Sequence, residues 1–150
     1  MTATSRFTVG RAGCAYVVPR EHPAPEDVRR DADIVFRERL PAACGRALSA
    51  LARDDDPSVW LVERLDVEVA WAGSRDDLAG EWSAQIARAL TRTLHRAEGV
   101  LHFPTRAAFV ARFIADAATG RDAGKWYYAQ FDALSVAADA LIEKTRAEAE

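Results

Sequence analysis

The chain has 150 residues, about the usual size of one domain, with 20 basic and 23 acidic residues and a net charge of -3. Neither sign forms a long block, which argues against nucleic acid as a partner. The sequence contains neither the roughly 20-residue apolar run of a membrane span nor the apolar core of a signal peptide. It therefore predicts a soluble, cytoplasmic single domain with one hydrophobic core.

The first third of the chain predicts a short β element and then a long helix. Residues 7–18 are rich in β-branched and aromatic side chains with glycines between them, which is typical of an edge strand or loose hairpin. Pro25 and the acidic residues after it favour a helix start, and apolar positions then recur every three or four residues over about 26–52. Pro41 lacks a backbone N–H, so it should kink or restart this helix.

Residues 59–71 predict a strand, because apolar and charged side chains alternate in their second half. We expect the apolar side chains to face the core, namely Leu65, Val67 and Val69. The charged side chains should face water, namely Arg64, Asp66 and Glu68. Glu63, Asp66 and Glu68 fit a solvated strand face better than a carboxylate site. With residues 7–18, this strand predicts a small two- or three-stranded sheet packed against about four helices, an α+β fold.

The second half of the chain is predicted to be mainly helical. Ser74 to Asp77 resembles a capping box and opens a helix over about 75–97, followed by a short apolar link at 100–103. A further helix over about 105–119 ends at Gly120, and a last helix covers about 126–146. We expect all of these elements to belong to one domain of residues 1–150.

The segment WYYAQF, residues 126–131, holds four aromatic side chains that would cover most of the circumference of a helix. We expect structural packing roles for Phe109, Phe113, Trp126 and Phe131. Tyr127 and Tyr128 are the candidates for an interaction surface, because a tyrosine can place its ring on a partner and keep its hydroxyl hydrated.

Residues that could carry chemistry are few. His22, His95 and His102 have no partner in a known catalytic frame, and Cys14 and Cys44 lack metal-ligand spacing and read as reduced thiols. The glycine-containing ATGRDAGK stretch does not follow a strand, so it is no phosphate-binding loop. The sequence predicts no catalytic residue, no cofactor, no metal ion and no enzyme activity.

Two stretches resemble the N-terminal region of the tape-measure proteins of bacterial contractile injection systems, which are phage-tail-like machines. The first is the strand at residues 59–71 with the helix after it, and the second runs from residue 103 to residue 134. The matching positions are Arg64, Leu65, Val67 and Val69, and then Phe103, Phe113, Asp116, Gly120, Trp126, Tyr127, Tyr128 and Phe131. The chain departs from the family at RDAGK, where an aromatic residue often stands.

The resemblance implies a non-catalytic structural and assembly module that binds other protein subunits: tube, baseplate or its own copies. The resemblance also implies that the protein is located in the cytoplasm or within an assembled or released particle. Family chains are far longer, so the sequence is expected to be a short relative or an excised N-terminal domain. The alternative is a small bacterial regulatory or adaptor domain that binds a peptide or effector through its aromatic face.

Overall fold

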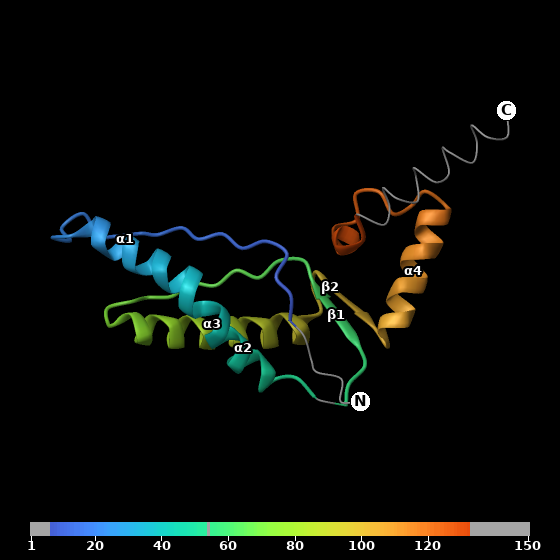
Figure 1. The fold of residues 1–150 in the computed structure, drawn as a ribbon, viewed down its shortest axis with the longest axis horizontal. Helices are drawn as coiled ribbons and strands as arrows, with labels where there is room; N and C mark the ends of the chain where they lie inside the picture. Colours follow the sequence, from blue (N-terminus) through green and yellow to red (C-terminus); the bar gives the residue numbers. More distant parts are fainter. Residues whose placement is uncertain (1–6, 54, 133–150) are drawn as a thin grey trace. The chain divides into compact units, whose positions relative to one another are not determined.

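A computed structural model describes residues 7–53 and 55–132. In chain order the elements are α1 (Pro25–Ile34), the π-helical turn η1 (Val35–Arg39), α2 (Leu40–Ser49), β1 (Val59–Val62), α3 (Arg75–Arg96), β2 (Val100–Phe103), α4 (Arg106–Ala118) and the 3₁₀ helix η2 (Trp126–Phe131) (Figure 1). The predicted α+β class is confirmed. Among the described residues, no helix is long and apolar enough to cross a membrane.

The chain divides into two compact units, where the sequence predicted one core. The first unit contains residues up to 56 and residues 64–98, and the second contains residues 57–63 and those from 99 onward. Each unit has its own buried hydrophobic cluster, one built on α1 to α3 and one built on α4 and η2. The strand that the sequence predicted at 59–71 spans the division, which explains why its two halves behave differently.

The predicted break in the first helix occurs next to Pro41. The N–H of Leu40 donates to the carbonyl of Val35, five residues earlier, which is the hydrogen bond of a π turn. Pro41 then lies in the first turn of α2, where its missing N–H removes no helical hydrogen bond. The helical path therefore continues from α1 through η1 into α2 with one local widening.

The first unit is held together by α3 packing against the α1–η1–α2 path. Its buried cluster comprises Ala32, Val35, Ala43, Leu78 and Ala79. The predicted capping box is present at the start of α3: the Asp77 N–H donates to the Ser74 hydroxyl, and the Ser74 N–H donates to the Asp77 carboxylate. Arg75 Nε donates to Asp31 of α1 at 2.9 Å and ties the two helices at their ends.

The expected strand or hairpin at residues 7–18 is wrong. This segment has no regular secondary structure, and most of its side chains are exposed, Val17 almost completely at 97%. Tyr16 attaches it to the first unit, since its hydroxyl donates to Asp33 Oδ1 at 2.8 Å and its ring packs on the first cluster. β-branched residues form a strand only where a partner strand accepts their backbone hydrogen bonds, and none pairs with this segment among the described residues.

The sheet pairs β1 with β2, antiparallel, with Val59 opposite Phe103 and Val62 opposite Val100. Residues 100–103, predicted to be only an apolar link, therefore supply the second strand. The ladder extends to Glu63, whose N–H donates to the carbonyl of Gly99 at 2.9 Å. Gly99 has a φ of 63°, a left-handed conformation that glycine adopts without strain, and this turn leads the chain from α3 into β2.

The predicted strand at 59–71 is correct only over its first four residues, but the predicted alternation in its second half is confirmed. Leu65, Val67 and Val69 are half-buried, whereas Arg64, Asp66 and Glu68 are exposed. Val69 and Trp71 pack against the first cluster. Among the described residues no strand pairs with this segment, so its side-chain pattern comes from packing on the first cluster.

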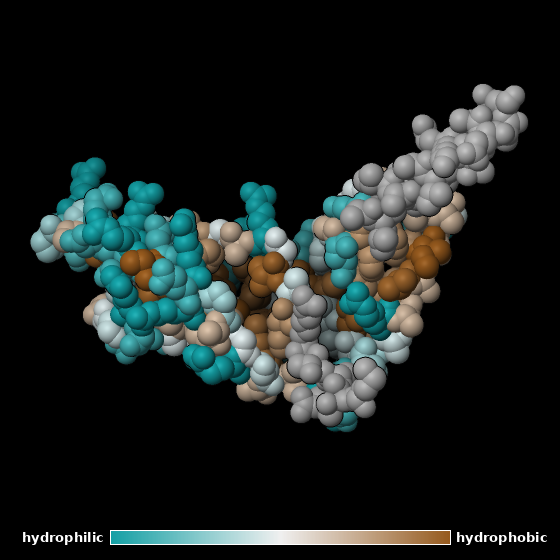
Figure 2. All heavy atoms as spheres, in the orientation of Figure 1, coloured by the Kyte–Doolittle hydropathy of each residue, from teal (hydrophilic) through white to brown (hydrophobic). Residues whose placement is uncertain are grey.

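The second unit is built around α4, whose buried face carries Phe109 and Phe113. Tyr128 and Phe131 of η2 complete this cluster, and Val59, Leu61 and Phe103 of the sheet pack against it. Ile114 on the same helix is 59% exposed, and Figure 2 shows hydrophobic atoms at the surface of this part of the molecule. The last helix predicted at 126–146 begins as η2, and its remainder from 133 lies outside the described residues.

Candidate functional site

The WYYAQF segment forms η2, and its side chains take different roles from those predicted. Phe109, Phe113 and Phe131 are buried as expected. Tyr128, predicted to belong to an interaction surface, is only 3% exposed, while Trp126, predicted to be core, is 36% exposed. Tyr127 remains half-buried at the edge of the cluster. The predictions for Tyr128 and Trp126 are therefore wrong.

The reason for this exchange is the pitch of η2. A 3₁₀ helix has three residues per turn, so residues three apart lie on the same face. Tyr128 and Phe131 therefore point together into the second cluster, and Trp126 points elsewhere. The α-helical pitch of 3.6 residues used in the sequence prediction groups these side chains differently.

Asp116 is the residue that organises this region. It lies near the end of α4, where the chain leaves the helix through a Schellman motif: the Arg121 N–H donates to the Asp116 carbonyl at 2.7 Å, and the Gly120 N–H donates to the Ala117 carbonyl at 3.0 Å. Gly120 has the left-handed φ of 67° that this motif requires. The motif turns the loop back toward the side chain of Asp116.

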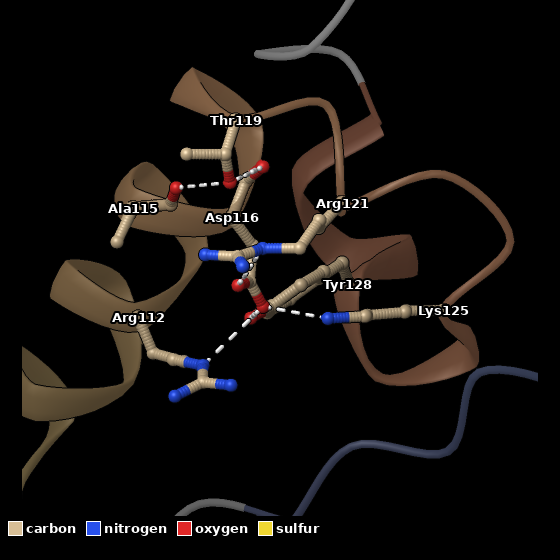
Figure 3. A network of polar contacts seen from close by, with 7 residues as sticks. All are labelled: Arg112, Ala115, Asp116, Thr119, Arg121, Lys125 and Tyr128. Atoms are coloured by element: carbon tan, nitrogen blue, oxygen red, sulfur yellow. Dashed lines mark hydrogen bonds and ion pairs between the residues drawn. The ribbon is translucent and has the colours of Figure 1, made fainter.

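The side chain of Asp116 is almost completely buried, at 2% exposed, and gathers polar groups from the helix and the loop. Its Oδ2 accepts hydrogen bonds from Lys125 Nζ at 2.7 Å and from the Tyr128 hydroxyl at 2.7 Å (Figure 3). Arg112 Nε, one turn earlier on α4, donates to the same oxygen at 3.3 Å. Arg121 Nε lies 3.8 Å from Oδ1, an ion pair beyond hydrogen-bond distance.

These contacts stabilise the charged form of Asp116. The hydrogen bonds from Lys125 and Tyr128 hold the pKa of the Asp116 carboxyl well below its usual range, although burial acts in the opposite direction. Burial and the hydrogen bond to Asp116 raise the pKa of the Tyr128 hydroxyl to about 12. A carboxylate near the C-terminal end of a helix is unfavourable against the helix dipole, and the surrounding cations compensate for it. At neutral pH Asp116 is therefore negatively charged and the Tyr128 hydroxyl is protonated.

A chain of cation–ring and ring–ring contacts leads from this cluster to the exposed tryptophan. Lys125 Nζ lies over the rings of Tyr127 and Tyr128, 5.8 and 5.7 Å from their centroids. The Tyr127 and Trp126 rings meet edge to face at 5.4 Å. We call the exposed and half-buried side chains of this path the aromatic–basic surface; it comprises Arg112, Arg121, Lys125, Trp126 and Tyr127.

The histidines lie in separate surroundings and do not come together. His22 accepts a hydrogen bond from the Ala24 N–H at its Nδ1, and His95 is exposed in the last turn of α3. His102 stacks on Trp60 across the two strands, with ring centroids 3.9 Å apart. Among residues 7–53 and 55–132, no group of three or more histidine, cysteine or acidic side chains has the arrangement of a metal site.

A cavity of about 520 Å³ lies in the first unit, beside the residue 7–18 segment. It is lined by Ala12, Gly13, Cys14, Tyr16, Arg29, Asp33, Phe36 and Arg37. Partial desolvation raises the pKa of the Cys14 thiol, although the residue as a whole is exposed. Cys14 and Cys44 are both free thiols.

The carboxylates predicted to be solvated, Glu63, Asp66 and Glu68, are all exposed, and Asp66 forms an exposed ion pair with Arg64.

The sequence pattern identified Asp116 only as a position in a motif and gave no prediction of its central role. A usable signal was present, because Asp116 follows Phe109 by seven residues and Phe113 by three, which places it on the buried face of α4. An acidic residue on such a face requires partners. The three polar residues that meet its side chain besides Arg112 all lie within the next twelve positions.

Comparisons with family models, with curated proteins and with solved structures find no match. The resemblance to tape-measure proteins therefore stays a prediction.

Proposed function

We propose that this chain is a non-catalytic assembly module that binds other protein subunits through Trp126 and Tyr127. In keeping with its resemblance to the N-terminal region of tape-measure proteins, the proposed partners are tube or baseplate components of a contractile injection system. The observation that carries the proposal is the exposed Trp126, held beside half-buried Tyr127 on a helix anchored to α4.

Anchoring favours binding because an aromatic side chain that is already ordered loses little freedom when a partner covers it. Tyr128, next to Tyr127, is bound to Asp116, and Lys125, next to Trp126, is bound to the same carboxylate. The segment between these two anchors therefore has little conformational freedom to lose. Tryptophan and tyrosine are also the residues that most often contribute strongly to protein interfaces.

The chemistry of the buried groups supports binding over catalysis. A general acid or base works best with a pKa near the working pH, whereas the pKa of Asp116 is lowered and that of Tyr128 is raised to about 12. Both shifts move the groups away from neutral pH. The cluster is suited to holding the loop in one conformation.

The test is a double variant, Trp126→Ala with Tyr127→Ser, compared with Trp60→Ala as a matched control. Trp60 is 48% exposed in the same unit, on the sheet instead of η2. Purified tube and baseplate subunits of a contractile injection system would be tested for capture on each immobilised variant. We expect the double variant to lose capture and to melt nearly as the unaltered protein does, and the control to retain capture. Equal capture by all three proteins would contradict the proposal.

A further inference from the structure

The aromatic–basic surface has an uneven balance of charge. Arg112, Arg121 and Lys125 surround one carboxylate, Asp116, and that carboxylate is buried. Arg112 and Arg121 are 64% and 67% exposed, so their charge is presented to solvent. The surface beside Trp126 is therefore positive, in a chain whose net charge is -3.

We propose that the aromatic–basic surface binds an acidic segment of a partner protein, with carboxylates on Arg112 and Arg121 and an apolar side chain on Trp126. This inference rests on the proposed function and names the chemistry of its partner. Complementary charge selects the partner and increases the rate of encounter, while the aromatic contact supplies most of the affinity.

The two arginines have donors to spare for such a partner. Arg112 meets Asp116 through Nε, and Figure 3 shows its two terminal nitrogens pointing away from that carboxylate. The contact of Arg121 with Asp116 is the ion pair of 3.8 Å between Nε and Oδ1, which is longer than a hydrogen bond. A guanidinium can bind a carboxylate with two parallel hydrogen bonds through such nitrogens. Lys125, 28% exposed and bonded to Asp116 at 2.7 Å, has mainly an internal role.

The other charges of this segment do not cancel the surface. Asp122 is half-buried in the same loop and Asp132 is exposed after η2, while Arg106 adds another exposed cation at the start of α4. Asp116 is buried, so it offsets one of the three positive charges around it without itself contacting a partner. An acidic segment would therefore meet more positive than negative charge here.

Arginine, lysine and aromatic side chains also bind single-stranded nucleic acid, but that mode requires cations spread along a groove that follows the backbone. Here the cations converge on a single buried carboxylate. This arrangement suits a short cluster of carboxylates, and binding of nucleic acid is an outcome that the experiment must be able to show.

The experiment measures fluorescence anisotropy with three labelled peptides and the full chain. The first peptide is rich in Glu around one central Leu, the second has Gln in place of each Glu, and the third has Lys. A labelled single-stranded oligothymidylate is the fourth probe. We expect binding of the Glu peptide alone, weakening as salt is added because exposed charges are screened. Equal binding of the Gln peptide, or tighter binding of the oligothymidylate, would overturn the proposal.

Substitutions of Arg112 and Arg121 test whether these two side chains bind the Glu peptide. Arg112→Gln with Arg121→Gln should weaken binding of the Glu peptide about tenfold, whereas Arg112→Lys with Arg121→Lys should retain most of it. The control, Arg46→Gln with Arg92→Gln, removes the same charge from exposed positions of the first unit and should change little. Circular dichroism melting checks that each variant is folded. If the control weakens binding as much as the first pair, the inference is wrong.

The two proposals fail in different ways. If Trp126→Ala with Tyr127→Ser abolishes subunit capture and the Gln variants do not change it, the partner is not selected by its acidic residues and only this inference falls. If neither set of variants changes capture, the proposed function falls as well.

Discussion

The Tyr128 hydroxyl donates to Asp116 Oδ2 at 2.7 Å, across twelve positions of the chain, and both side chains are buried. This bond joins the aromatic helix η2 to the end of α4. The first prediction is that Tyr128→Phe, which removes only the hydroxyl, destabilises the protein by about 1.5 to 3 kcal/mol, the usual range for a hydrogen bond to a charged group. Tyr127→Phe is the control and should cost less, because Tyr127 is only half-buried. Chemical denaturation with equal losses for the two variants would contradict the prediction.

Asp116→Asn tests the ion cluster itself. The substitution keeps the shape of the side chain but removes the charge that three cations share, so they would repel one another without compensation. We expect the melting temperature to fall by several degrees, whereas Asp132→Asn, at an exposed position of the same unit, should leave it nearly unchanged. Similar melting of the two variants would show that the cluster does not stabilise the fold.

The same carboxylate predicts how stability depends on pH. Because the pKa of Asp116 is lower in the folded than in the unfolded protein, its stabilisation is complete above the unfolded value of about 3.9 and is lost as the pH falls below it. The difference in melting temperature between the unaltered protein and Asp116→Asn should therefore be constant near neutral pH and shrink below about pH 4. A difference that grows as the pH falls would have the wrong sign.

The burial of η2 predicts unequal effects for its two large apolar side chains. Phe131→Ala should cost about 3 to 5 kcal/mol, since it removes a ring that stacks on Phe113 at 4.5 Å inside the second cluster. Trp126→Ala should cost much less, because Trp126 is 36% exposed. Equilibrium unfolding measures both values. A larger loss for Trp126→Ala would restore the packing role predicted from the sequence.

The extended segment after β1 allows a test in the first unit. Val69 is half-buried and packs on the first cluster, so Val69→Asp should destabilise the protein by about 1 to 3 kcal/mol, because it places a carboxylate against apolar side chains. Glu68→Asp alters the neighbouring exposed side chain and should have almost no effect. Thermal melting that ranks the two variants in the opposite order would refute the alternation.

The sequence by itself determined the elements whose signals are local. The capping box of Ser74 and Asp77, the helix start at Thr105 and the stop at Gly120 were predicted correctly, because each depends on side chains within a few positions. The alternation of residues 64–69 was also correct. A period of two places side chains on opposite faces of any extended segment, whether or not a partner strand is present.

Only the tertiary structure decided which segments pair and which side chains are buried. Residues 100–103, too short to give a strand signal, became β2 because β1 offered backbone partners, and residues 7–18 stayed irregular without such partners. Tyr128 and Trp126 exchanged their predicted roles. Asp116 accepts hydrogen bonds from Lys125 and Tyr128, and η2 has the pitch of a 3₁₀ helix, so that Tyr128 points into the second cluster and Trp126 does not. These outcomes depend on contacts between separate segments of the chain, and the periodicity of a single segment carries no information about them.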